Sequence, residues 1–255
     1  MHPVLTTLHV GDAELPIASY GVLLTCALLV GALGTLRATR LSAAGPPLEL
    51  GAVISALGLA IAFGFGGALL VHAAAQLART GSLAAALAQP GVSVLGALLG
   101  GAAAVLWSAR WLGLSAPRLL DAAVPWVALA QAIGRIGCLL GGCCYGLASH
   151  APWALRYPDL TSGFVARIPV PLIEAFALLG LAGLYLRLPA RLANAWRCPG
   201  ARAASYLALY ALLRLILEPL RGDSVRGVYF GGSVSTAQLI AAATLASALL
   251  FLRKK

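Results

Sequence analysis

The chain has few charged residues and few acidic ones in particular. Of its 255 residues, 10% are charged, only 8 are Asp or Glu, and 60% are hydrophobic, with a mean hydropathy of +0.90. Soluble domains carry about 25% charged residues. This composition excludes an ordinary soluble protein and predicts an integral membrane protein.

The sequence also lacks a recognisable set of zinc ligands. Tetrahedral zinc sites need four spaced ligands, and two adjacent cysteines are poorly placed to share one metal with a third. We therefore expect no metal site and no cofactor. We interpret the cysteines as small apolar residues that let helices pack closely, with a disulfide left open if the adjacent pair faces an oxidising compartment. The five cysteines are Cys26, Cys138, Cys143, Cys144 and Cys198.

The chain shows no repeat of fixed period, no low-complexity tail and no soluble domain, so we expect a single polytopic membrane domain over residues 1–255. A helix needs about 20 apolar residues to cross a hydrocarbon core of about 30 Å. Seven stretches meet this requirement, which predicts an all-α membrane fold. They are Ser19–Leu36, Leu50–Leu70, Val92–Trp111, Ala122–Leu140, Pro169–Leu186, Ala203–Leu220 and Ser233–Leu252.

The basic residues are distributed unevenly between the loops. If the N-terminus lies outside, the inner loops and the tail hold eleven Arg or Lys residues and the outer loops hold five. Positive loops stay cytoplasmic, so we predict an outer N-terminus and a cytoplasmic C-terminus. The net charge of +10 then reflects topology and attraction to anionic lipid rather than nucleic-acid binding. The inner set is Arg37, Arg40, Arg110, Arg118, Arg187, Arg191, Arg197, Arg202, Arg253, Lys254 and Lys255, and the outer set is Arg79, Arg156, Arg167, Arg221 and Arg226.

Two connections are long enough to hold structure of their own, Arg187–Arg202 and Leu147–Ile168. The second contains PWALRYP, whose prolines, aromatic rings and arginine suit an amphipathic segment at the lipid headgroups. An ordinary ordered loop is the alternative.

Two arginines fall inside predicted spans. Arg135 lies in the fourth span, and Arg214 lies in the sixth, with Glu218 and Arg221 on the same helical face. Ionisable groups at membrane depth are costly and face a cavity or the bundle interior. Arg214 and Glu218 neutralise each other in the simplest interpretation, but one carboxylate cannot balance three arginines. The excess positive charge indicates an anion.

A phospholipid phosphate is the anion available in such a cavity. Guanidinium binds phosphate oxygens through paired hydrogen bonds and stays protonated when it is desolvated. The glycines that surround Arg135 allow a ligand or another helix to approach the backbone closely, and helix packing alone is the alternative. These glycines are Gly134, Gly137, Gly141, Gly142 and Gly146.

At this point a family resemblance becomes visible. The pattern D-x-x-x-P-x-x-x-L-x-x-x-x-G-R-x-G, which runs from Asp121 to Gly137, resembles the signature of the prolipoprotein diacylglyceryl transferase family. The other segments that resemble the family follow in its order and cover essentially the whole chain. They are Tyr20-Gly21, GVSVLGALLGG (91–101), PVPLIEA (169–175) and YALLRLILEPLRGD (210–223).

The resemblance implies a multi-pass enzyme of the bacterial inner membrane. Its reaction moves the sn-1,2-diacylglyceryl group of phosphatidylglycerol to the thiol of the lipobox cysteine in a prolipoprotein signal peptide, and glycerol phosphate leaves. By the same resemblance, Arg135, Arg214 and Tyr20 are catalytic. The resemblance also implies a set of phospholipid-binding residues, which are Arg135, Arg214, Gly146, Glu218 and Arg221.

The chain departs from the family at several polar positions. The usual His-Gly-Gly of the third span is Leu95-Gly96-Ala97, so the histidine that would help to deprotonate the thiol is absent. Two asparagines and a glutamate after the signature arginine are replaced by Cys138, Gly141 and Cys143, and a Gln and a Tyr of the fifth span by Pro171 and Ile173.

These departures leave two alternatives to the transferase. One is an accessory protein that binds phospholipid without catalysis. The other is a glyceryl transferase that acts on a different acceptor.

The distribution of basic residues makes the topology testable. We expect a reporter fused after Lys255 to be active only in the cytoplasm, because the C-terminal RKK follows the inner-loop excess of basic residues. Paired green fluorescent protein and alkaline phosphatase fusions measure this. Phosphatase activity with no fluorescence would reverse the predicted orientation.

Overall fold

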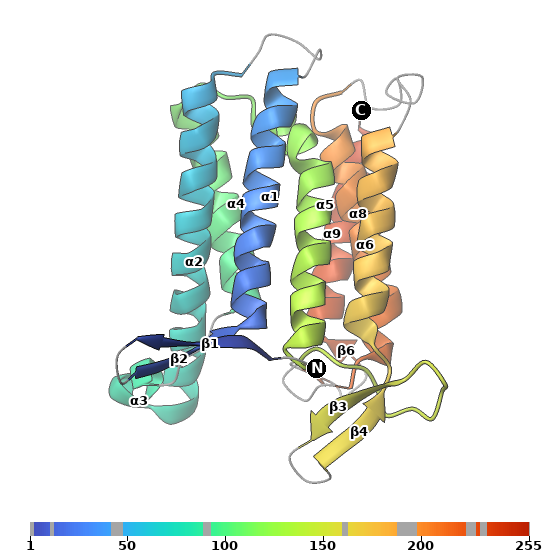
Figure 1. Cartoon of the computed structure of the whole chain (residues 1–255). Coiled ribbons are helices and arrows are strands. Elements are labelled where there is room, and N and C mark those ends of the chain that lie inside the picture. Colours follow the sequence, from blue (N-terminus) through green and yellow to red (C-terminus); the bar gives the residue numbers. More distant parts are fainter. Residues whose placement is uncertain are drawn as a thin grey trace. The chain divides into compact units, whose positions relative to one another are not determined.

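The computed structural model describes residues 3–10, 13–41, 48–88, 93–159, 163–187, 198–222, 228–229 and 234–254. Helices dominate this part of the chain (Figure 1). They are α1 (Ser19–Leu41), α2 (Leu50–Thr80), α3 (Leu83–Ala88), α4 (Val94–Trp111), α5 (Ala116–Leu140), α6 (Val170–Arg187), α8 (Ala201–Leu217), the short 3-10 helix η2 (Glu218–Leu220) and α9 (Thr236–Arg253).

Among the described residues, five helical segments are long and apolar enough to cross a membrane. This confirms the helical membrane-protein class, and α4 and α9, with 18 residues each, coincide with the third and seventh predicted spans. The count of seven crossings stays a prediction. The five segments are Ser19–Arg40, Leu50–Leu77, Ala116–Leu140, Val170–Arg187 and Ala201–Leu220.

Two helices are longer than their predicted spans. α2 continues past Leu70 to Thr80, because the sequence AAAQLART favours helix, and it ends at Gly81 in the left-handed conformation with φ of 66°. α5 begins at Ala116 rather than Ala122 and carries Pro125 inside it. Hydropathy locates the apolar centre of a helix better than its polar ends.

The described residues also form three two-stranded antiparallel sheets, a small β component that an all-α description does not include. The hairpin β3–β4 occupies the segment expected to be an interfacial stretch or a loop, and it pairs Tyr157 with Val165. The strands are β1 (Val4–Val10) with β2 (Ala13–Ala18), β3 (Leu155–Asp159) with β4 (Gly163–Arg167), and β5 (Val228–Tyr229) with β6 (Val234–Ser235).

Some sequence-based predictions lie outside the described residues. Most of the connection Arg187–Arg202 does so, including Arg191 and Arg197, as do Arg226 and Lys255 of the basic residues counted for topology.

The chain forms two compact units. The first comprises Met1–Gly34 and Ala123–Lys255, and the second comprises Thr35–Ala122, so that α1 and α5 each run from one unit into the other. The single domain over residues 1–255 stays a prediction.

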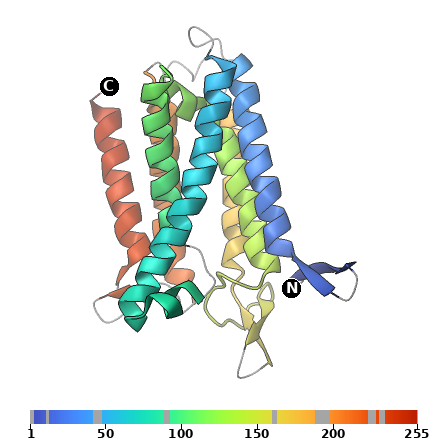
Figure 2. The ribbon, with the colours of Figure 1, turned by 90° about the vertical axis from the view of Figure 1, so that its left-hand side faces the viewer.

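The second unit is built on close contact between α2 and α4, which run side by side (Figure 2). Gly67 of α2 faces Gly96 of α4 so closely that a Cβ on either residue would collide with the other's carbonyl group. Gly100 meets the carbonyl of Phe63 in the same way. Small residues let helix backbones approach where hydrophobic burial gives little gain, as in a bilayer.

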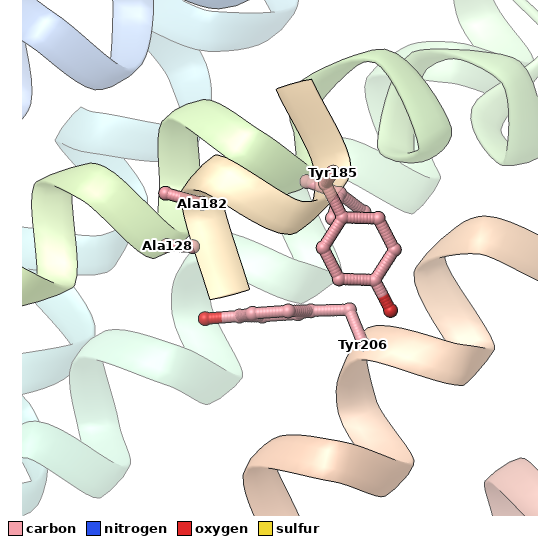
Figure 3. Close-up of a cluster of buried hydrophobic side chains, with 5 residues drawn as sticks. Ala128, Ala182, Tyr185 and Tyr206 are labelled. Atoms are coloured by element: carbon pink, nitrogen blue, oxygen red, sulfur yellow. The ribbon is translucent and has the colours of Figure 1, made fainter. Parts of the chain in front are cut away.

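In the first unit, α5, α6 and α8 pack around an aromatic cluster (Figure 3). Figure 3 shows the ring of Tyr185 above that of Tyr206, with Ala128 and Ala182 beside them. The ring centroids lie 6.0 Å apart in an edge arrangement. The buried Tyr206 hydroxyl donates to Gln131 Oε1 at 2.8 Å. The small alanine side chains therefore leave space for the two tyrosine rings, and Gln131 accepts the hydrogen bond of the Tyr206 hydroxyl.

The glycine contact predicts a specific loss of stability. We expect Gly67→Ala to lower the free energy of unfolding by about 1–3 kcal/mol, because its Cβ forces α2 and α4 apart. Gly66→Ala is the matched control, since Gly66 has nothing within 4 Å of an added Cβ. Unfolding in mixed detergent micelles measures both variants. Equal stability of the two would contradict the close packing.

Candidate active site

A buried carboxylate on α6 lies at the centre of the candidate site. Glu174 is fully buried. Its Oε1 lies 3.0 Å from Nε of Arg135 on α5, and its Oε2 lies 3.1 Å from Nη1 of Arg214 on α8. The two arginines singled out from the sequence therefore meet on one carboxylate.

A second carboxylate completes the contacts of Arg214. Glu218, which opens η2, places Oε2 2.7 Å from Nη2 of Arg214, one helical turn away. The Tyr210 hydroxyl donates to Oε1 of Glu174 at 3.3 Å. Arg214 is thus held between two buried acids, and its side chain is only 10% exposed. This geometry makes Arg214 a fixed part of the site.

The structure changes the charge balance that the sequence predicts around the two arginines. It set a single carboxylate, Glu218, against three arginines. The structure adds Glu174, so that two acids match Arg135 and Arg214. Sequence reasoning missed Glu174 as a site residue, although an ionisable group inside the fifth predicted span was the same signal that singled out the arginines.

Arg135 is the more accessible of the two arginines. Its side chain is 20% exposed, and its ion pair with Glu174 uses Nε. The terminal NH₂ groups of the guanidinium are not taken up by that ion pair. The guanidinium of Arg135 can therefore bind an anion while Glu174 fixes its orientation through Nε.

Glycines on α5 bring Tyr20 of α1 against the same helix. A Cβ on Gly137 would lie 3.3 Å from the Tyr20 ring, and one on Gly141 would lie 3.8 Å from the Tyr20 Cβ. Tyr20 is partly exposed and interacts electrostatically with Arg135. By contrast, Gly134 has nothing within 4 Å. Close approach of α1 therefore explains Gly137, whereas a Cβ on Gly141 would make only ordinary contact with Tyr20.

Three backbone segments converge at Gly146. Its N–H donates to the Ile168 carbonyl at 2.8 Å, and the next residue, Leu147, donates to the Leu220 carbonyl at 2.9 Å. A Cβ on Gly146 would collide with Ile168 and the Leu220 carbonyl. An isolated β-bridge joins Gly146 to Arg221. Gly146 thus brings the loop after α5 beside Arg221.

A hairpin covers the end of α5. Tyr157 of β3 is fully buried, and Pro158 packs on Gly142. Burial raises the pKa of Tyr157 to about 12, so the hydroxyl stays protonated at neutral pH. Arg167 of β4 lies 4.4 Å from the Tyr145 ring centroid and 3.0 Å from Asp159. The loop that follows Arg135 is therefore held by packed aromatic and charged groups.

The segment that stands in place of the family's His-Gly-Gly lies in α4, in the second unit, and consists of Leu95, Gly96 and Ala97. The side chain of Leu95 lies outside the described part of the chain. Gly96 serves the contact with α2.

Comparison with known proteins identifies the family. A family model described as prolipoprotein diacylglyceryl transferase matches residues 6–253. The chain belongs to this family. The resemblance first seen in the signature around Arg135 is confirmed.

Similar members of the family are phosphatidylglycerol–prolipoprotein diacylglyceryl transferases from several bacteria. The protein from Leifsonia xyli is 30% identical over 248 residues, which cover 90% of this chain and 72% of that protein. The protein from Gloeobacter violaceus is 33% identical over 62% of this chain and 58% of its own length. The match to the Dehalococcoides mccartyi protein is 31% identical and covers 54% of this chain. The chain spans only about half the length of several relatives, for example 52% of the Dehalococcoides mccartyi protein.

The shared carboxylate predicts a large effect on stability. We expect Glu174→Gln to lower the free energy of unfolding by about 3–5 kcal/mol, because it leaves two buried arginines without their common acid. Glu49→Gln, at an exposed position before α2, should change little. Unfolding in mixed micelles measures both.

A double-mutant cycle separates this loss of charge from a packing defect. The double variant Glu174→Gln with Arg135→Gln should lose less free energy of unfolding than the two single variants lose together. No uncompensated guanidinium remains at Arg135 in the double variant. Strict additivity would contradict the ion pair.

Proposed function

We propose that the chain transfers the sn-1,2-diacylglyceryl group of phosphatidylglycerol to the thiol of a prolipoprotein lipobox cysteine. The observation that carries this proposal is the meeting of Arg135 and Arg214 on Glu174, in which Arg135 uses Nε and leaves its terminal NH₂ groups outside that ion pair. Family membership and the names of the relatives support it.

In this proposal Arg135 binds the phosphate of the lipid. Glu174 fixes the guanidinium through Nε, and Arg214 fixes Glu174 from the other side. A preorganised cation in a site with little water stabilises negative charge that develops on a leaving group. The orientation of Arg135 is therefore set before the substrate arrives.

The transfer forms one bond and breaks one bond. The acceptor sulfur attacks the glyceryl carbon that bears the phosphate, the C–S bond forms, and the C–O bond to phosphate breaks. Glycerol phosphate leaves with the electron pair, and the thiol proton passes to solvent or to the departing phosphate. A free thiol with a pKa of about 8.5 is already a few per cent thiolate near neutrality, and neighbouring arginines increase this fraction. A dedicated base is therefore helpful without being indispensable.

Tyr20, Gly146, Glu218 and Arg221 complete the proposed site. Glu218 holds Arg214, and Gly146 brings Arg221 to the same end of α5. Tyr20 is an exposed residue that interacts electrostatically with Arg135. We assign Arg221 to the lipid headgroup as a second cation.

We also propose a bacterial inner-membrane location, with seven crossings, an outer N-terminus and a cytoplasmic C-terminus. The basic residues of the loops support this topology. In the first unit, the two ends of the chain lie at opposite ends of the helices (Figure 1), as an odd number of crossings requires.

A second candidate function is a phospholipid-binding protein without transferase activity, or one that uses another acceptor. The replacement of the family histidine by Leu95 favours it. Such a protein would keep the phosphate site and bind phosphatidylglycerol without modifying a lipobox cysteine.

Replacement of Arg135 tests the assignment of roles. We expect Arg135→Lys to lower turnover about 100-fold or more with little loss of stability, because Lys keeps the charge but loses the paired donors. Transfer of labelled diacylglyceryl from phosphatidylglycerol to a lipobox peptide measures this. Arg187→Lys, at an exposed position on α6, is the matched control.

Two outcomes would contradict the proposal. Equal turnover of Arg135→Lys and the unmodified chain would make Arg135 structural. Binding of phosphatidylglycerol without any transfer by the unmodified chain would favour the accessory protein.

A further inference from the structure

Three cysteine sulfurs meet beyond the end of α5. Cys138 is buried in the last turns of the helix, and Cys143 and Cys144 follow in the next loop. The three Sγ atoms lie within 4.8 Å of one another. Residues described elsewhere in the chain add no further Cys, His, Asp or Glu to this group. The sequence had suggested that the adjacent cysteines are poorly placed to share one tetrahedral metal with Cys138, but the three sulfurs lie together.

The backbone explains how adjacent cysteines converge. Gly142 has a φ of 71°, and Cys144 has a φ of 57°, the one positive φ at a non-glycine residue in the described ranges. The N–H of Cys143 donates to the Cys138 carbonyl at 3.0 Å, which folds the loop back on the helix. A left-handed cysteine is strained, and such strain concentrates at functional sites. Here it turns a second sulfur toward the group.

Positive charge lies near the group. Arg135 and Arg221 both interact electrostatically with Cys144. The fully buried Tyr157 hydroxyl, which has no hydrogen-bond partner among the described residues, interacts electrostatically with the same thiols. It is an unused donor at the edge of the group.

We propose that Cys138, Cys143 and Cys144 form a three-thiolate binding site for one copper(I) ion. Metal–thiolate bonds of about 2.3 Å place three sulfurs about 4 Å apart in a trigonal plane, which the observed spacing accommodates. Zinc prefers four ligands, whereas soft thiolates select copper(I).

Binding involves no redox step. Each thiol releases its proton to solvent, three Cu–S bonds form, and copper keeps its oxidation state. The centre carries negative charge, which Arg135 and Arg221 offset, and Tyr157 can donate a hydrogen bond to a bound sulfur. The site borders the proposed transfer site, because Arg135 and Arg221 are assigned to both.

Anaerobic titration with copper(I) against a coloured chelator tests the proposal. The purified full chain in detergent should hold one copper(I) ion, with three sulfur neighbours at about 2.3 Å by X-ray absorption. Cys144→Gly should bind more than about 100-fold more weakly, since loss of an outer partner alone costs about 10- to 100-fold. Glycine also adopts the positive φ without strain, so this variant is expected to fold.

Matched controls use the two cysteines outside the group. Cys26→Ser and Cys198→Ser should keep one copper(I) ion per chain. Failure of the unmodified chain to hold copper(I), or unchanged affinity in Cys144→Gly, would overturn the proposal. Nitrogen or oxygen neighbours in place of sulfur in the absorption spectrum would do the same.

Discussion

The buried carboxylate of Glu174 is the interaction on which the first unit depends. It binds Arg135 of α5 and Arg214 of α8 while belonging to α6, so one acid fixes three helices relative to one another. An unpaired arginine at this depth would cost several kcal/mol. The ion pairs therefore select the rotation of each helix about its own axis, which apolar packing among leucines and alanines specifies poorly.

The aromatic layer beyond the ion pairs depends on the same arrangement. Tyr210 donates to Glu174, and its ring stacks on Tyr206 at a centroid distance of 6.2 Å. Tyr206 in turn reaches Gln131 of α5 with its hydroxyl. Polar contacts thus follow one another along the interior of α5 and α8. This chain of contacts joins the charged site to the aromatic core, so the site and the fold share their stabilising interactions.

The sequence predicted the helical membrane class and the family, because both depend on local information. Apolar length locates a helix, and the spacing around Arg135 is read directly along the chain. The pair Arg214–Glu218 was also visible, since i and i+4 lie on one face. Glu174 carried the same signal as the arginines, an ionisable group inside a predicted span, but no local spacing reports that its partners lie on α5 and α8. The β3–β4 hairpin was missed because its register depends on residues buried by the rest of the unit.

The cysteines show most clearly what a spacing rule leaves out. Their positions in the sequence suggested separate apolar residues, because an extended or helical backbone directs adjacent side chains apart. A positive φ at Cys144 removes that restriction. The family resemblance implies an asparagine and a glutamate at the positions of Cys138 and Cys143. The acid lost at Cys143 would have balanced positive charge near Arg135. Glu174, 3.0 Å from Arg135, supplies negative charge here, which offsets the cost of burying the guanidinium.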